Sequence, residues 1–297
     1  MKQTATLPAM NREQQEDVLR AWRESARYWE RHGDVIRAMF DPVARAMIED
    51  AGITAGQDVL DVAGGAGEPA FTIAETVGFS GSVTYTDAIQ EMVDSAEREA
   101  KRRRLTNIKF RQCPAESLPF DNDRFDRAVC RFGIMFFPDP VAAAREMLRV
   151  IKPEGLMVLA AWRGPQFNPF FRVVAEIMSR YIEPVEEDPD APGAFRFAEA
   201  GAVANVLKQA GATVEKDRVL DFLMEPPVTL EEFWPLRVEL SDTLREKVAR
   251  LSAEQLVRVE SEVRAAAREF FPDGRMRFPA QVNIVTASNH LPADGDA

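Results

Sequence analysis

The fold is decided by the stretch Val59-Leu-Asp-Val-Ala-Gly-Gly-Ala-Gly-Glu-Pro-Ala70. The apolar run 58–62 is short and is followed by Gly64-Gly-Ala-Gly67, so it predicts a buried strand and a tight turn. Residues 69–77 then have the pattern of a helix. A strand, a glycine-rich turn and a helix form half of a nucleotide-binding unit. The N-terminus of such a helix offers unpaired N–H groups, which suit a carboxylate or a phosphate.

The same alternation of strands and helices continues outward from this unit. Strands are predicted over 83–86, 107–112, 125–130 and 156–162, and helices over 89–104 and 140–151. This alternation implies right-handed crossovers and a parallel sheet with helices on both faces. Two later strands are predicted over 214–224 and 281–286. We therefore predict an α/β fold with a Rossmann-like, doubly wound, mostly parallel seven-stranded sheet and a helical cap.

The chain is expected to divide into three consecutive parts without an interdomain linker. Residues 1–54 form an N-terminal helical cap, and 55–163 form the Rossmann-like core. Residues 164–297 supply further cap helices and the last two strands of the same sheet. Within this last part, 230–270 is predicted to be helical. The acidic, proline-rich stretch 183–193 is expected to be a surface loop that serves as a mobile lid.

The composition is that of a folded globular protein, since 46% of the 297 residues are hydrophobic and 29% are charged. The net charge of −11 argues against a nucleic-acid partner, because phosphate contacts need a basic surface. No apolar run reaches the roughly 18 residues of a membrane helix, and no apolar signal segment begins the chain. With 2 cysteines and 2 histidines, we expect a cytoplasmic, reduced protein without a metal.

The glycine turn can be interpreted in more than one way. Gly65-Ala-Gly67-Glu-Pro-Ala70 matches the G-x-G-x-x-G/A pattern of a dinucleotide fold, and Asp87 is placed to accept from both ribose hydroxyls. An NAD(P)-binding oxidoreductase is therefore one interpretation. However, Glu68 at the helix start would repel a pyrophosphate, and Asp61 inside the first strand suits a cationic ligand better. A glycine turn without any ligand is a third alternative.

Further motifs follow the turn in the order and at the spacing of a known family: Val59–Gly67; Tyr85–Asp87 with Ile89–Met92; Pro114–Phe120 with Phe125–Asp126; Phe132–Pro140; and Leu148–Gly155. In these motifs the chain resembles the class I S-adenosylmethionine (SAM)-dependent methyltransferases of the methyltransferase type 11 group, and is similar to ubiquinone/menaquinone-biosynthesis C-methyltransferases. The resemblance covers about 55–163 and extends to the flanks only in layout. It implies SAM as cofactor, S-adenosylhomocysteine as its product, and 55–163 as the SAM-binding core.

The resemblance also implies roles for individual residues at the cofactor. Asp61 would orient the amino group of SAM, and Asp87 would bind the ribose. Pro114 stands where the family has an aspartate that accepts from the adenine amino group, so Glu116 or a backbone carbonyl has to replace it. The complete set of expected cofactor-binding residues is Asp61, Ala63, Gly64, Gly65, Gly67, Asp87, Ala88, Ile89, Met92, Pro114, Ala115, Glu116, Arg131 and Phe132.

The acceptor side is less defined by the sequence. Methyl transfer from a sulfonium is a direct in-line displacement, so the protein mainly aligns the two reactants and excludes water. We expect a small organic acceptor, with the methylated C, O or N atom left open, and no metal. His32 is the first candidate for a general base, and Arg131 for binding an acidic acceptor. The candidates for an apolar acceptor pocket are Tyr28, Trp29, Phe136 and Trp162.

Other interpretations stay open at this point. The bulky apolar residues of the cap could bury a homodimer interface instead of a pocket. A protein with this fold could also bind SAM without turnover, and both His32 and Arg131 could have purely structural roles. Lys101-Arg-Arg-Arg104, at the predicted C-terminus of a helix, is expected to be a solvated helix end and not an RNA site.

Overall fold

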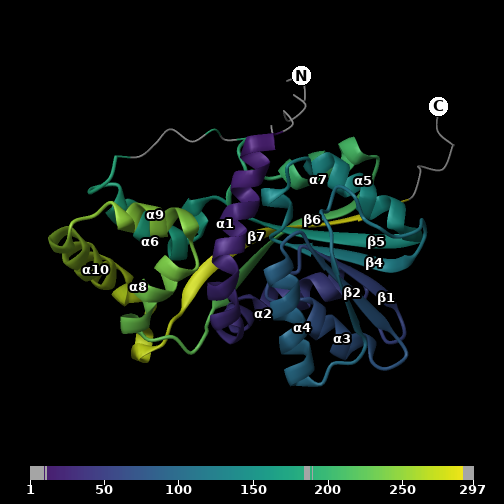
Figure 1. Cartoon of the computed structure of the whole chain (residues 1–297), viewed down its shortest axis with the longest axis horizontal. Coiled ribbons are helices and arrows are strands. Elements are labelled where there is room, and N and C mark those ends of the chain that lie inside the picture. The colour runs from purple at the N-terminus through teal and green to yellow at the C-terminus, as the bar shows by residue number, and fades with distance from the viewer. Residues whose placement is uncertain (1–9, 11, 184–187, 189, 290–297) are drawn as a thin grey trace.

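The computed structural model describes residues 10, 12–183, 188 and 190–289 and shows the predicted sheet (Figure 1). Its seven strands lie in the order β3-β2-β1-β4-β5-β7-β6. Their bounds are β1 (Asp58–Val62), β2 (Ser82–Asp87), β3 (Ile108–Gln112), β4 (Phe125–Arg131), β5 (Ile151–Trp162), β6 (Thr213–Met224) and β7 (Phe278–Ser288). Strands β1 to β5 pair in parallel, whereas β7 runs antiparallel to both β5 and β6. The fold class predicted from the sequence is therefore confirmed.

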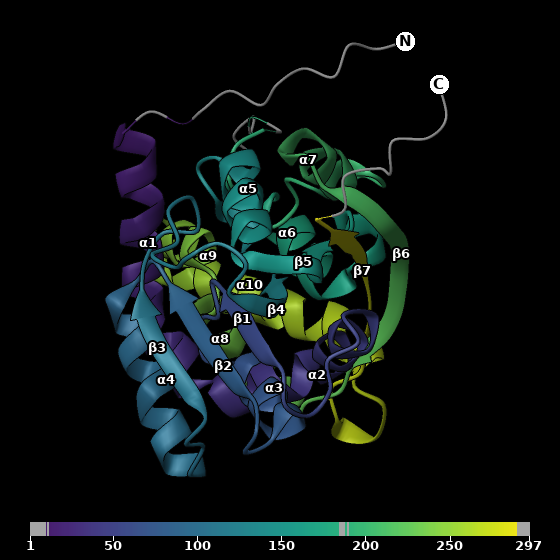
Figure 2. The same cartoon turned by 90° about the vertical axis from the view of Figure 1, so that its right-hand side faces the viewer.

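Helices cover both faces of the sheet, as Figures 1 and 2 show. One face carries α2 (Gly33–Asp50), α3 (Ala70–Val77) and α4 (Gln90–Arg103), and the other carries α5 (Pro140–Val150) and α7 (Ala202–Ala210). Because of this double cover, β1 and β2 are buried along almost their whole length. The crossovers from β1 to β2 and from β4 to β5 move in opposite directions along the sheet. The carboxyl ends of β1 and β4 therefore flank the crevice where such sheets bind ligands.

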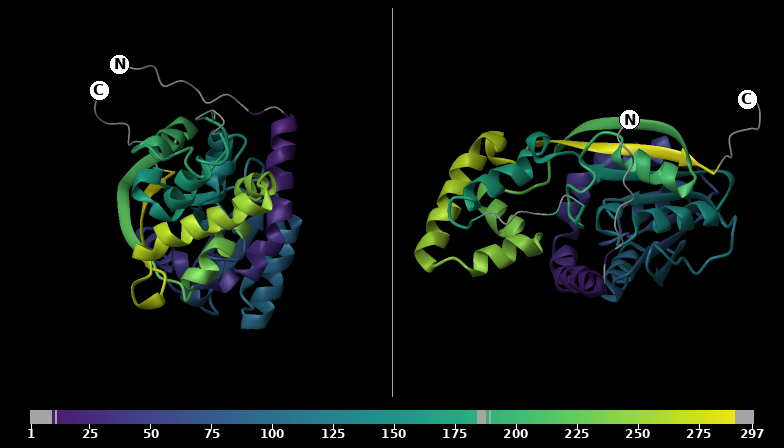
Figure 3. Two further views of the ribbon diagram at one scale, coloured as in Figure 1. Left: turned by 90° about the vertical axis from the view of Figure 1, so that its left-hand side faces the viewer. Right: turned by 90° about the horizontal axis from the view of Figure 1, so that it is seen from above.

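The remaining helices extend the molecule beyond the sheet, on the side where α6 (Pro169–Met178) leaves β5 (Figures 1 and 3). They are α8 (Leu230–Glu239), α9 (Asp242–Ala249) and α10 (Ala253–Ala267), while α1 (Arg12–Arg31) lies between this group and the sheet. The stretch 230–270 is largely helical, as predicted, but it is divided into three α-helices and a short 3-10 helix. Ser241 and Ser252 break it, because each side chain caps a new helix by accepting from a backbone N–H three residues on.

Other sequence predictions can also be placed. Cys113 and Cys130 are buried free thiols, and burial raises their pKa values to about 11 and about 12. Within the described ranges, no helix combines the length and apolar character needed to cross a membrane. Five of the eleven residues of the expected lid loop 183–193, namely 184–187 and 189, lie outside the described residues.

Candidate functional site

The turn after β1 has one glycine whose backbone faces open space. A Cβ atom at Gly64 would lie 2.3 Å from Cε2 of Tyr85, and one at Gly67 would lie 2.0 Å from Cζ of Phe71. At Gly65, by contrast, no atom of the described residues, its two chain neighbours aside, lies within 4 Å of that position, and the residue has a φ of +54°. Gly64 and Gly67 are thus required by packing within the protein, while Gly65 leaves room for a ligand to approach the backbone.

The end of β2 holds this turn in place. Asp87 accepts hydrogen bonds from the backbone N–H of Gly65 at 3.0 Å and of Ile89 at 2.9 Å, one on each carboxylate oxygen. The hydroxyl of Tyr85 donates to the Gly65 carbonyl at 2.6 Å. Burial raises the pKa of Asp87 to about 6, although these backbone N–H groups favour its charged form. Each oxygen keeps a free lone pair that can accept from a ligand hydroxyl.

Asp61 and Arg131 lie on β1 and β4, the two strands that flank the crevice. Asp61 is completely buried, and no donor of the described chain has hydrogen-bonding geometry to either carboxylate oxygen. Burial raises the pKa of Asp61 to about 8, opposed by Arg131 and by the Ala70 N–H nearby. Arg131 is also buried and donates from one nitrogen to the Glu68 carbonyl at 2.8 Å, but its Nε and Nη1 are unpartnered among the described residues.

These two side chains suit a zwitterion. A buried carboxylate without a donor stabilises an ammonium group, and a guanidinium with free N–H groups stabilises a carboxylate. Both charges occur together at the amino-acid end of a ligand such as a methionine derivative. Because Gly65 opens beside them, the residues present fit a ligand with an amino-acid end and a ribose for Asp87.

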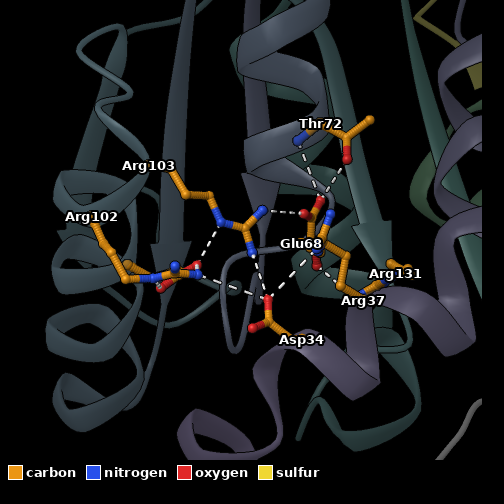
Figure 4. A network of polar contacts seen from close by, with 8 residues as sticks. Asp34, Arg37, Glu68, Thr72, Arg102, Arg103 and Arg131 are labelled. Atoms are coloured by element: carbon orange, nitrogen blue, oxygen red, sulfur yellow. Dashed lines mark hydrogen bonds and ion pairs between the residues drawn. The ribbon is translucent and has the colours of Figure 1, made fainter. Parts of the chain in front are cut away.

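A polar network, drawn in Figure 4, borders the turn on its other side. Glu68 accepts from Nη1 of Arg103 at 3.1 Å and from the hydroxyl of Thr72 at 2.8 Å. Asp34, in the first turn of α2, forms longer ion pairs with Arg37, Arg102 and Arg103. The network surrounds a cavity of about 380 Å³ that Ala66 and Arg131 also line. The turn, α2 and α4 are therefore joined through charged side chains.

This network corrects two expectations. Arg103 is not part of a solvated helix end, because only 17% of its side chain is exposed and it pairs with Glu68 and Glu99. The charge of Glu68 is balanced by Arg103 and the side chain points along α3, so repulsion of a pyrophosphate by Glu68 no longer argues against a dinucleotide. The buried carboxylate of Asp61 now argues against a dinucleotide instead, because a pyrophosphate offers no cation for it.

Ile89 and Met92, two of the expected cofactor-binding residues, lie under α1. Ile89 and Met92 are buried together with Ala26, and the side chains of Leu19, Trp22 and Trp29 pack against them. Trp22 lies edge-on to both Trp29 and Phe136, with ring centroids 5.4 and 4.9 Å apart. Trp22, which the sequence did not place in the site, thus connects two of the predicted pocket residues.

The loop after β3 carries Pro114, Ala115 and Glu116. Cys113, just before it, donates its N–H to the carbonyl of Asp87 at 3.0 Å, which places the loop beside the end of β2. Glu116 accepts from the Asp139 N–H at 3.3 Å, and burial raises its pKa. Glu116 therefore keeps acceptor capacity, and its role in place of the family's aspartate stays a prediction.

The ends of β4 and β5 carry stacked aromatic rings. Phe132, with a φ of +63°, stacks on Trp162 at a centroid distance of 4.5 Å and an interplanar angle of 4°. Phe40 of α2 lies edge-on to both rings. A left-handed conformation is uncommon for an aromatic residue, and such strain concentrates at functional sites. Ala63, at the end of β1, has a similar φ of +57°.

His32 and Tyr28 lie away from these rings. Nε2 of His32 is 2.5 Å from Oε2 of Glu239, at the C-terminus of α8. The ring of Tyr28 is covered by the guanidinium groups of Arg27 and Arg245, at 4.6 and 4.7 Å. Tyr28 of α1 and His32, which lies between α1 and α2, thus contact residues of the cap helices. The structure thus brings Phe132 and Trp162 together, and Trp29 and Phe136 through Trp22, but not Tyr28.

The strand order, the glycine turn and the acidic residues ending β1 and β2 define a Rossmann-like nucleotide-binding protein. Residues 12–185 match the model of the ubiE/COQ5 methyltransferase family. This match covers more than half of the chain, which therefore belongs to that family.

Individual proteins resemble parts of the sequence or share its fold. An uncharacterized protein of Mycobacterium tuberculosis is 35% identical over 136 residues, which are 46% of this chain and 47% of that protein. The ubiquinone/menaquinone biosynthesis C-methyltransferase UbiE of Coxiella burnetii is 40% identical over 120 residues, 38% of this chain and 46% of UbiE. The chain thus spans about half the length of these curated relatives. A putative methyltransferase of Bacillus halodurans shares the fold, with a TM-score of 0.53, 20% identity, and coverage of 84% of this chain and 99% of the other.

Proposed function

We propose that this protein transfers the methyl group of SAM to a small organic acceptor. The observation that carries the proposal is the buried pair of Asp61 and Arg131, both with unused hydrogen-bonding capacity beside the open backbone of Gly65. A sulfonium amino acid linked to a ribose satisfies all three groups, together with Asp87. Membership of the ubiE/COQ5 methyltransferase family supports the same cofactor.

Each of these residues would bind a different part of SAM. Asp61 would accept from the amino group, Arg131 would donate to the carboxylate, and Asp87 would accept from the ribose hydroxyls. When bound, SAM supplies a methyl group already activated by its positively charged sulfur. The protein then has to orient the acceptor in line with that methyl group and keep water out.

The acceptor would lie among the rings at the ends of β4 and β5. Phe132 and Trp162 stack on each other there and would form an apolar wall for it, while Trp22 and Trp29 of α1 cover Ile89 and Met92. His32 is held by Glu239 and would act as a base only if a movement of α1 turned it toward the acceptor. We further propose that the protein is cytoplasmic. The alternative to an acceptor pocket is that the apolar residues of the cap form a homodimer interface.

The rival function is NAD(P)-dependent oxidation. A thermal unfolding screen of the purified protein with SAM, S-adenosylhomocysteine and NAD tests it. We expect both SAM compounds to raise the melting temperature and NAD to leave it unchanged, because a pyrophosphate offers no cation to Asp61. Stabilisation by NAD alone would contradict the proposed function.

A further inference from the structure

Arg237, on α8, is a buried cation without a counter-ion. The residue is only 6% exposed, and it lies on the face of α8 that also buries Phe233, one helical turn earlier. No hydrogen bond or ion pair joins its guanidinium to any residue that the structure describes, and its Nε is buried without a partner. Burial alone lowers its pKa to about 10.

Two aromatic rings lie against this charged group. The guanidinium carbon lies 4.3 Å from the ring centroid of Phe170 and 5.1 Å from that of Phe171. Such contacts recover part of the solvation that an arginine loses on burial. They do not supply a hydrogen-bond acceptor for its buried Nε–H. By comparison, Arg180, Arg245 and Arg264 on or beside the cap helices each have an acidic or carbonyl partner.

The rings connect Arg237 to the proposed cofactor site. Phe171 lies edge-on to Trp162 with centroids 5.0 Å apart, and Trp162 stacks on Phe132 at the end of β4. Phe40 touches both of these rings, and Arg131 lies 5.5 Å from the Phe40 centroid. A continuous row of aromatic side chains therefore runs between two buried arginines, one at the glycine turn and one beneath the cap.

We infer that the methyl acceptor carries a carboxylate on a planar, unsaturated framework, and that Arg237 binds this carboxylate. The inference rests on the proposed function and names the acceptor class for the same site. The guanidinium fork matches the geometry of a carboxylate, and such a bond is strong where water is excluded. Rings such as those of Phe171 and Trp162 suit the flat part of the molecule. The carboxylate would lie at the cap end and the methylated atom near Phe132.

Binding of two matched probes tests the inference without knowledge of the natural acceptor. We would titrate the protein, saturated with S-adenosylhomocysteine, with 1-naphthoate and with the uncharged 1-naphthamide. We expect the wild type to bind the acid at least about tenfold more tightly than the amide, as a charge-assisted hydrogen bond allows. Arg237→Met should abolish this preference, and Arg237→Lys should retain part of it. Arg258→Met, which removes an exposed arginine of α10, should leave it unchanged.

A second measurement separates a binding role from a structural one. Because Arg237 has no hydrogen bond or ion pair with a described residue to lose, Arg237→Met should raise the melting temperature of the free protein. A large fall would show that the arginine supports the fold, and would overturn the inference. So would a wild type that binds the acid no better than the amide, or neither probe. S-adenosylhomocysteine binding is measured in each protein, so a failure of the proposed function is recognised separately.

Discussion

The carboxylate of Asp87 accepts a hydrogen bond from the backbone N–H of Gly65 at 3.0 Å. This bond joins the end of β2 to the turn after β1, so the residue proposed to bind the ribose also shapes the loop that meets the rest of the cofactor. The second oxygen of Asp87 accepts a hydrogen bond from the N–H of Ile89 at 2.9 Å. Binding and preorganisation therefore depend on one side chain.

Asp87→Ala should weaken SAM binding at least about tenfold, because each charge-assisted hydrogen bond to the ribose contributes about 1.5–3 kcal/mol. It should also lower stability by roughly 1–3 kcal/mol, since two backbone N–H groups lose their acceptor. Calorimetry and urea unfolding measure the two effects. Asp94→Ala, an exposed residue of α4, is the control and should change neither. An unchanged SAM affinity in Asp87→Ala would remove the ribose role.

Substitutions in the turn should separate ligand contact from packing. Gly65→Val should leave a folded protein that no longer binds SAM, because its side chain enters space otherwise open to the ligand, at a backbone cost of about 1–2 kcal/mol for the positive φ. Gly67→Ala should instead destabilise the fold, since its Cβ would clash with the Phe71 ring. Circular dichroism and SAM titration distinguish the outcomes. If folded Gly65→Val binds SAM normally, the turn is not the cofactor turn.

Asp61→Asn should change how stability depends on pH. The pKa of Asp61 is about 8 in the folded protein and near 3.8 in the unfolded chain, so the folded state holds an extra proton between these values. Stability of the ligand-free protein therefore falls as pH rises through this window, by up to about 1.4 kcal/mol per pH unit. The asparagine variant lacks this pH-dependent loss. The difference between its free energy of unfolding in urea and that of the wild type should therefore grow from pH 5 to pH 8. A difference that stays constant would contradict the buried, unpartnered carboxylate.

Arg103→Met should destabilise the protein by about 3 kcal/mol, because it leaves Glu68 buried beside the glycine turn without its cation. The neighbouring Arg102→Met is a matched control, since 64% of that side chain is exposed, and it should cost no more than about 0.5 kcal/mol. Urea unfolding at neutral pH measures both. Equal effects would mean that the Glu68–Arg103 pair is a surface contact in solution.

The alternation of strands and helices along the chain was predictable because buried strands such as β1 and β2 are short apolar runs followed by a turn or a polar loop. The carboxyl end of each strand also marked Asp61, Asp87 and Arg131 in advance. The helix breaks inside 230–270 were missed, because the apolar spacing continues across Ser241 and Ser252. The two serines end one helix and begin the next through their capping hydrogen bonds, which this spacing does not reveal. The covering of Ile89 by Trp22, and the pairing of Glu68 with Arg103, depend on contacts between distant segments. Arg237 did leave a signal, since it is a charged residue at a core-facing position of an apolar helix.

Asp61 and Arg131 are proposed to recognise the amino-acid end of the cofactor. Calorimetric titration with S-adenosylhomocysteine and with 5′-methylthioadenosine, which lacks that end, tests this proposal most directly. We predict that the wild type binds S-adenosylhomocysteine at least about a hundredfold more tightly, as two buried charge-assisted contacts require, and that Asp61→Asn loses most of the difference. Equal affinity of the wild type for the two compounds would contradict the account.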